Sequence, residues 1–136
     1  MTDTHPTAST ARGEQLARLV ATGVGLVFVG AGLWAFAAPR SFFEQAATFE
    51  PYNAHLIRDI GAFQLGLGAV LLLANRLRDT LLVALTGVAV GATAHTGAHI
   101  IDRDLGGQPA LDIPAFGLIA ILLIVAAAAR HRTQHR

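Results

Sequence analysis

Apolar residues dominate four long stretches of the sequence, and short polar segments separate them. The stretches cover about residues 19–38, 54–74, 80–101 and 113–129. A helix needs about 20 mostly apolar residues to cross the roughly 30 Å hydrocarbon core of a bilayer. Each stretch approaches that length, so the pattern predicts four membrane-spanning helices.

The segment between the first two stretches has a helical pattern of its own. Ser41 and Glu44 have the spacing of a capping box, in which each side chain bonds the backbone N–H of the other residue. The aromatic residues Phe42, Phe43 and Phe49 lie at spacings that give one apolar face. We therefore predict a short interfacial helix after the first span, at the outer end of the bundle.

The composition agrees with a chain embedded in lipid. Of the 136 residues, 53% are hydrophobic and 14% are charged, whereas a soluble domain carries about 25% charged residues. The predicted fold is therefore an all-α, four-helix transmembrane bundle. We expect a disordered cytoplasmic tail over residues 1–15, the four-span membrane domain over residues 16–129, and a basic cytoplasmic tail over residues 130–136.

The placement of arginine predicts the orientation of the bundle. Cytoplasmic loops and tails of membrane proteins carry an excess of basic residues. Arg40, Arg58 and Arg103 fall on one predicted side, and seven arginines fall on the other: Arg12, Arg18, Arg76, Arg78, Arg130, Arg132 and Arg136. This bias predicts a multi-pass protein of the plasma membrane with both termini in the cytoplasm.

A secretory signal peptide is the alternative for the first stretch. Ala35, Phe36 and Ala37 resemble a cleavage site of the A-x-A type. However, the apolar region of a signal peptide has about 7–15 residues, and this stretch is longer. An uncleaved membrane helix is the preferred interpretation.

Ionisable residues cluster at the outer ends of the second and third stretches. His55 and Asp59 are one helical turn apart, and His95, His99 and Asp102 follow an i, i+4, i+7 spacing. Each set therefore forms one stripe on its helix. Ionisable groups inside a membrane usually face the bundle interior and find partners there. We expect the two stripes to face each other across antiparallel helices, in one pocket near the outer surface.

Imidazoles and carboxylates are ligands that zinc, copper and iron accept. The cluster therefore predicts a metal site formed by His55, Asp59, His95, His99 and Asp102. Haem between the second and third helices, a quinone or lipid headgroup pocket, and a proton relay are alternatives. A polar network that only holds the two helices in register is a further one. The chain has no cysteine, which excludes thiolate ligands and disulfides.

Catalytic motifs of known type are missing from the sequence. Thr96 stands between the two histidines of HTGAH where HExxH metalloproteases carry their general base. There is also no phosphate-binding loop, dinucleotide-binding glycine loop or nucleophile–base pair. The chain is therefore not expected to be a self-contained enzyme.

Small residues predict where the helices pack closely. Gly87 and Gly91 in the third stretch, and Ala62 and Gly66 in the second, have the small-xxx-small spacing of contacting membrane helices. The first stretch has a similar character, with glycines at positions 23, 25, 30 and 32. These spacings favour close packing in general and indicate no particular pair of helices. Gln64, deeper in the second stretch, is predicted to form a hydrogen bond within the bundle.

Two segments carry a resemblance to a known family. The sequences PRSFFE (39–44) and PYNAHLIRDIGAFQLGLGAVLL (51–72) resemble small four-helix membrane proteins of actinobacteria that are similar in layout to DoxX-like proteins. The resemblance implies four spans, an interfacial stretch after the first, and polar groups at one end of the bundle. It also implies an association with quinone-linked redox complexes.

Together these features predict a small integral membrane protein with an outward-facing His/Asp cluster that binds a metal or a small ligand. The alternative is a redox or quinone-associated membrane complex subunit of DoxX type. The lipid bilayer is the expected partner. Association with a second copy of the chain or with another membrane protein is a further possibility. A net charge of +1 gives no reason to expect nucleic acid.

Overall fold

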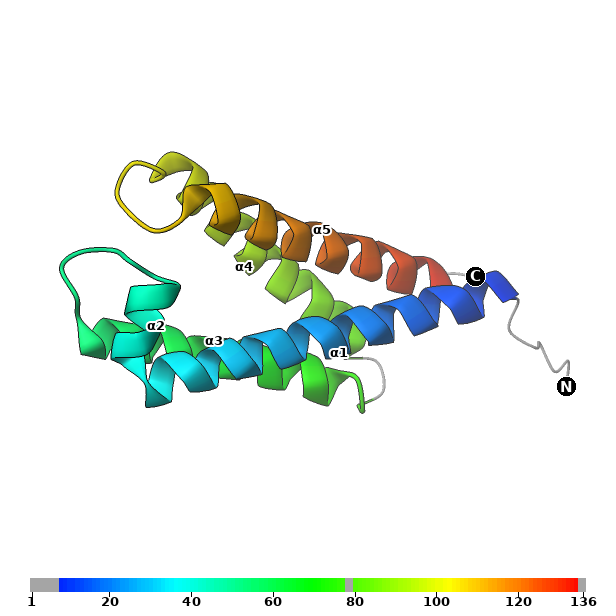
Figure 1. Cartoon of the computed structure of the whole chain (residues 1–136). Helices are drawn as coiled ribbons and strands as arrows, with labels where there is room; N and C mark the ends of the chain where they lie inside the picture. Colours follow the sequence, from blue (N-terminus) through cyan, green and yellow to red (C-terminus); the bar gives the residue numbers. More distant parts are fainter. Residues whose placement is uncertain (1–7, 78–79, 135–136) are drawn as a thin grey trace, which may run out of the picture.

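The chain is described by a computed structural model that covers residues 8–77 and 80–134. This part of the chain forms five helices (Figure 1): α1 (Ala8–Ala37), α2 (Pro39–Gln45), α3 (Ala54–Ala74), α4 (Leu81–Ile101) and α5 (Pro109–Gln134). All except α2 are long and apolar enough to cross a membrane. The predicted all-α architecture, with four candidate spans and a short helix after the first, is confirmed.

The four long helices pack as two antiparallel pairs. α1 packs along α3, and α4 packs along α5, whereas the consecutive helices α3 and α4 make few contacts. α1 also packs against α5, which joins the two pairs. In Figure 1 the pairs meet at the end that carries the start of α1 and the end of α5, and they diverge toward the opposite end. We call these the N/C end and the α2 end.

The interior of the bundle is mainly apolar. Leu71, Leu81, Leu85 and Leu123 are its largest fully buried side chains, and no polar or charged residue of the described part is buried as a whole. Many large apolar side chains lie on the outer surface instead, among them Phe63, Val83 and Leu118. A soluble protein rarely exposes so much apolar surface, so the fold fits a small integral membrane protein.

Four glycines bring the backbones of α1 and α3 into contact. A Cβ atom on Gly61 would lie 2.8 Å from the carbonyl oxygen of Gly32, and one on Gly68 would lie 2.7 Å from that of Gly25. In each helix the two glycines are seven residues apart, which is about two turns and returns to the same face. Only glycine fits at Gly32, Gly61 and Gly68, because an added Cβ would lie less than 3.0 Å from backbone atoms of the other helix. At Gly25 the nearest backbone atom would be Gly68 O at 3.2 Å.

The close packing predicted from small residues is confirmed on α1 for Gly25 and Gly32, and it is wrong for the spacings on α3 and α4. A Cβ atom added to Gly66, Gly87 or Gly91 would meet no atom within 4 Å, and Ala62 is exposed. These three glycines therefore do not touch a neighbouring helix.

The short helix α2 begins earlier than the capping box predicts. Pro39 occupies the first turn, where its fixed φ favours a helix start, and no side chain caps the helix. The Ser41 hydroxyl instead accepts hydrogen bonds from Trp34 Nε1 at 3.2 Å and Gln45 Nε2 at 3.0 Å. The predicted capping box is therefore wrong, although the helix exists and buries Phe42 and Phe43 at the α2 end.

Both predicted tails are partly helical. α1 begins at Ala8, inside the segment expected to be disordered, and α5 continues past the apolar run to Gln134. The physical reason is that charged residues in these segments pair with each other. Residues 1–7 and 135–136 of the predicted tails lie outside the described part of the chain.

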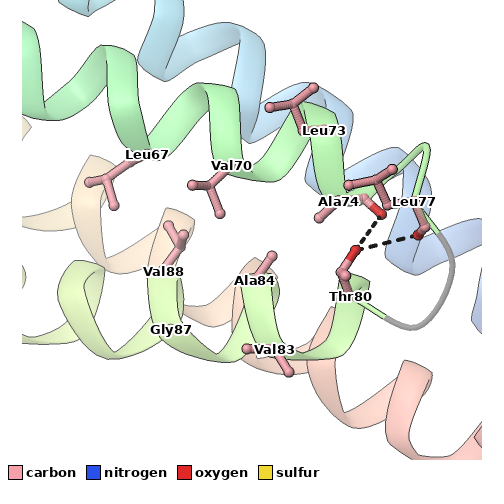
Figure 2. Close-up of a pocket in the computed structure, with 10 residues that line it drawn as sticks. All are labelled: Leu67, Val70, Leu73, Ala74, Leu77, Thr80, Val83, Ala84, Gly87 and Val88. Carbon is pink, nitrogen blue, oxygen red and sulfur yellow. Dashed lines mark hydrogen bonds between the residues drawn. The ribbon is translucent and has the colours of Figure 1, made fainter.

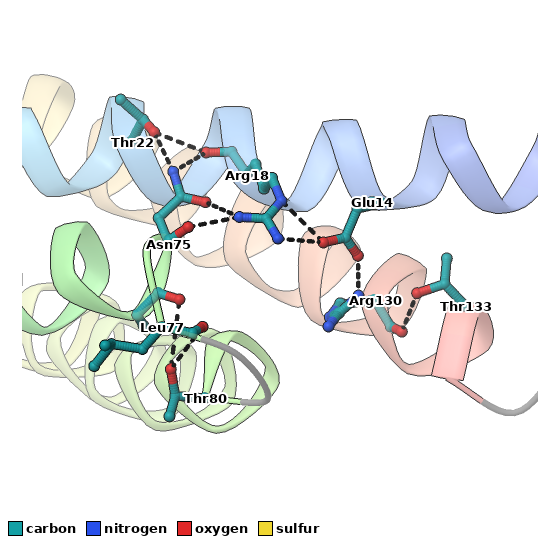
Figure 3. Close-up of polar contacts among 9 residues, drawn as sticks. Glu14, Arg18, Thr22, Asn75, Leu77, Thr80, Arg130 and Thr133 are labelled. Carbon is teal, nitrogen blue, oxygen red and sulfur yellow. Dashed lines mark hydrogen bonds and ion pairs between the residues drawn. The ribbon is translucent and has the colours of Figure 1, made fainter.

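A polar cluster joins three helices at the N/C end (Figure 3). Glu14 of α1 pairs with Arg18 at 2.8 Å and with Arg130 of α5. Arg18 donates to the backbone carbonyl oxygen of Asn75, which caps the C-terminus of α3. The side-chain amide of Asn75 donates in turn to the Thr22 hydroxyl at 2.7 Å. The cluster therefore holds α1 against both α3 and α5.

Candidate ligand site

The imidazoles of His95 and His99 lie in an aromatic cluster between α4 and α5. Their ring centroids are 4.8 Å apart, and Phe116 of α5 lies 4.5 Å from His95 and 4.9 Å from His99. Residues four apart share one face of a helix, so both histidines meet α5. The expected stripe on this helix is present, and its partner helix is α5.

Asp112, in the first turn of α5, is the carboxylate nearest to His99. Its Oδ2 atom lies 3.8 Å from His99 Nδ1, and both side chains are largely shielded from solvent. The same oxygen accepts a hydrogen bond from the backbone N–H of Gln108 at 2.8 Å. Asp112 lies just outside the fourth stretch predicted from the sequence, which begins at residue 113. Pro109 followed by an acidic residue is a signal for a helix start and could have identified it.

The structure divides the cluster predicted from the sequence. His55 Nε2 lies 3.4 Å from Asp59 Oδ2 on α3, and the His55 side chain is 87% exposed. The two stripes therefore do not share one pocket, and that expectation is wrong. The physical reason is that α4 pairs with α5 and makes few contacts with α3. Asp102 caps the end of α4 and is exposed.

Residues 8–77 and 80–134 contain no group of three or more His, Asp or Glu side chains placed to hold a metal ion. Metal or haem binding by His55, Asp59, His95, His99 and Asp102 stays a prediction.

His95 also lines an apolar cavity between the two helix pairs. The cavity has a volume of about 280 Å³ and is lined by residues of all four long helices. Aromatic and aliphatic side chains make up nearly all of the lining, and the polar side chains are His95 and Gln64. The lining residues are Phe28, Ile60, Phe63, Gln64, Leu67, Gly91, Ala92, His95, Phe116 and Ile119.

Gln64 brings an unused hydrogen-bonding group to this cavity. Its Oε1 atom is buried and has no hydrogen-bond partner among the described residues, so the predicted bond within the bundle is not formed there. A buried carbonyl oxygen without a partner is energetically costly, by about 1–3 kcal/mol. Gly91 lines the same cavity and has open space around it, because a Cβ added to Gly91 would meet no atom within 4 Å.

His95 lies between the cavity and a second, more polar hollow at the α2 end. This hollow has a volume of about 180 Å³, and its lining includes His95, His99, Asp102, Arg103 and Phe49. The imidazole of His95 therefore reaches an apolar space on one side and a polar one on the other.

Two loops are tied together over the α2 end. Gln108 Nε2 donates to the carbonyl oxygen of Gln45 at 2.9 Å. The backbone N–H of Gly107 donates to the carbonyl oxygen of Thr48 at 3.2 Å. Phe49 places its ring 6.0 Å from that of His99. These contacts link the two helix pairs where they are farthest apart.

No family model, curated protein or solved structure matches the chain. The resemblance to DoxX-like proteins therefore stays a prediction.

Proposed function

We propose that this chain is a small multi-pass membrane protein that binds a flat, lipid-soluble ring in the cavity between His95 and Gln64. The observation that carries the proposal is an apolar cavity with two polar side chains, one of which has an unpartnered oxygen. Ligand sites commonly have mostly apolar walls and a few polar groups that fix the orientation of the ligand.

The lining favours an aromatic or quinone ring with hydrogen-bonding substituents. Phe28, Phe63 and Phe116 can pack against a flat ring, since aromatic pairs gain energy beyond simple burial. A neutral imidazole can donate or accept, and a carboxamide can do both. His95 can thus donate to a ring carbonyl, and Gln64 Oε1 can accept from a ring hydroxyl.

A quinone and its reduced form carry this combination of groups. The cavity therefore also supports the alternative function, a quinone-associated subunit of a membrane redox complex, which the DoxX-like resemblance implies. In this proposal the plasma membrane surrounds the bundle. Both termini are cytoplasmic in this proposal, because the basic residues are in excess at the end of the bundle where α1 begins and where α3 and α5 end. Five described arginines lie there (Arg12, Arg18, Arg76, Arg130 and Arg132), against Arg40, Arg58 and Arg103 at the other end.

Loss of the His95 imidazole is expected to weaken ring binding. In lipid nanodiscs, isothermal titration calorimetry with 2-methyl-1,4-naphthoquinone should show saturable binding to the unaltered protein. His95→Ala should raise the dissociation constant about tenfold, which corresponds to one lost hydrogen bond of ~1.4 kcal/mol.

His55→Ala is the matched control, because His55 is an exposed histidine on α3 that does not line the cavity. Its affinity should equal that of the unaltered protein. The proposal fails if the unaltered protein does not bind the ring, or if the two alanine variants bind it equally well.

A further inference from the structure

A longer apolar groove continues from the cavity toward the N/C end, between α3 and α4 (Figure 2). Its volume is about 540 Å³, and Leu67 lines both spaces. In Figure 2, Leu67 and Val70 point from α3 toward α4, and Ala84 and Val88 point from α4 toward α3. The groove lies between α3 and α4, two consecutive helices that make few contacts with each other.

The groove offers almost no hydrogen-bonding groups to an occupant. Thr80 is the polar residue among those that line it, and its hydroxyl donates to the carbonyl oxygens of Ala74 and Leu77. The other lining residues are apolar side chains and Gly87. An occupant of this groove must therefore be a hydrocarbon.

The length and width of the groove limit what fits. On α3 the groove extends from Leu67 to Ala74, which is about 10 Å at a rise of ~1.5 Å per residue. A helix of that length and ~10 Å diameter would occupy roughly 800 Å³, which is more than the volume of the groove. A single hydrocarbon chain is thin enough to lie in it.

We infer that this groove holds the hydrocarbon tail of the ligand whose ring lies beside His95. The inference rests on the proposed function and assigns its ligand to a class: rings that carry a prenyl or alkyl tail. Leu67 marks the point where the ring cavity passes into the tail groove. Leu67 and Val70 are exposed at the surface of the bundle, so a tail can enter sideways from the lipid.

Two glycines allow the ring cavity and the tail groove to be filled separately. Gly91 lines the cavity, Gly87 lines the groove, and an added Cβ meets no atom within 4 Å at either position. Gly91→Leu and Gly87→Leu should therefore each occupy one space without displacing a helix. Gly30→Leu is the control, since Gly30 is equally open and lies on α1 away from both.

The experiment compares 2-methyl-1,4-naphthoquinone with the same ring carrying a tetraprenyl tail, in nanodiscs. Affinities are expressed per mole fraction in the bilayer, so that partition of the tail into lipid cancels. The tail should tighten binding about tenfold, because it exchanges contact with mobile lipid for a fitted groove. Gly87→Leu should abolish this gain in affinity and leave binding of the tailless ring unchanged. Gly91→Leu should weaken the binding of both probes, and Gly30→Leu should change the affinity for neither.

A tail-borne diazirine provides a second measurement that needs no variant. Photolysis should label the protein between Leu67 and Leu77 or between Thr80 and Val88, as read by peptide mass spectrometry. Ring binding without any gain from the tail, or a gain that persists in Gly87→Leu with labelling elsewhere, overturns the tail groove and leaves the proposed function standing. Absence of binding by both probes overturns the two proposals together.

Discussion

Replacing Gly61 with valine is expected to force α1 and α3 apart and to destabilise the bundle by about 3 kcal/mol, the upper part of the range for overpacked sites. A Cβ at this position would lie 2.8 Å from the carbonyl oxygen of Gly32 and 2.8 Å from the backbone nitrogen of Phe36. Both atoms belong to the backbone of α1, so they cannot rotate away as a side chain would. Relief requires the whole helix to move.

Thermal unfolding in detergent, followed by circular dichroism, measures this effect. Gly66→Val is the matched control, because Gly66 lies on the same helix and an added Cβ meets no atom within 4 Å. Its melting temperature should stay close to that of the unaltered protein. Equal melting of the two variants would mean that α1 and α3 do not cross at Gly61.

Removing the carboxylate of Glu14 is expected to have the second largest effect on stability. Glu14→Ala leaves Arg130, whose side chain is only 15% exposed, without its ion-pair partner. Arg130 Nε already lacks a hydrogen-bond partner among the described residues. Breaking a fully buried pair costs about 3–5 kcal/mol, and partial exposure of Glu14 lowers the expected cost to about 2 kcal/mol.

A double-mutant cycle separates this contact from other effects of the substitutions. Arg130→Ala should cost little once Glu14 has been replaced, because the arginine then has no carboxylate to lose. Glu44→Ala serves as the control. It breaks the exposed Arg40–Glu44 pair on α2, and exposed pairs contribute little. Strictly additive losses for Glu14→Ala and Arg130→Ala would show that their contact does not stabilise the junction of α1 and α5.

The bounds of the membrane helices can be predicted from the sequence because lipid imposes a strict requirement. Every backbone N–H and C=O in the hydrocarbon must be satisfied within the segment, so a run of about 20 apolar residues can only be helical. α3 spans Ala54–Ala74 as predicted, and α4 differs from the prediction by one residue at its start. The polar extensions of α1 and α5, including the first turn of α5 with Asp112, lie outside the predicted spans, because lipid imposes no such requirement there.

The pairing of the helices cannot be predicted in the same way. A helix in lipid is apolar on all sides, so its sequence carries no inward-facing stripe to mark the partner. The four-residue spacings on α3 and α4 pointed to glycines that touch no other helix. The glycines that meet, Gly25 and Gly32 on α1 and Gly61 and Gly68 on α3, are seven residues apart.

Because helix pairing could not be predicted, the neighbours of His95 and His99 could not be predicted either. His95 and His99 could be found because a polar residue within an apolar run is conspicuous. Their neighbours Phe116 and Asp112 depend on α4 lying against α5, and the unpartnered oxygen of Gln64 depends on the divergence of the helix pairs. These contacts are properties of the assembled bundle, and the only local signal among them is the helix start at Pro109, which could have placed Asp112 in the first turn of α5.

The sparse contact between α3 and α4 means that the protein is organised like two subunits in one chain. Each half is a helical hairpin whose main internal contacts are local, α1 with α3 and α4 with α5. The first hairpin can close while the second is still being synthesised, since helices become stable in the bilayer before they associate. Assembly then reduces to one docking event between α1 and α5, as in a heterodimer.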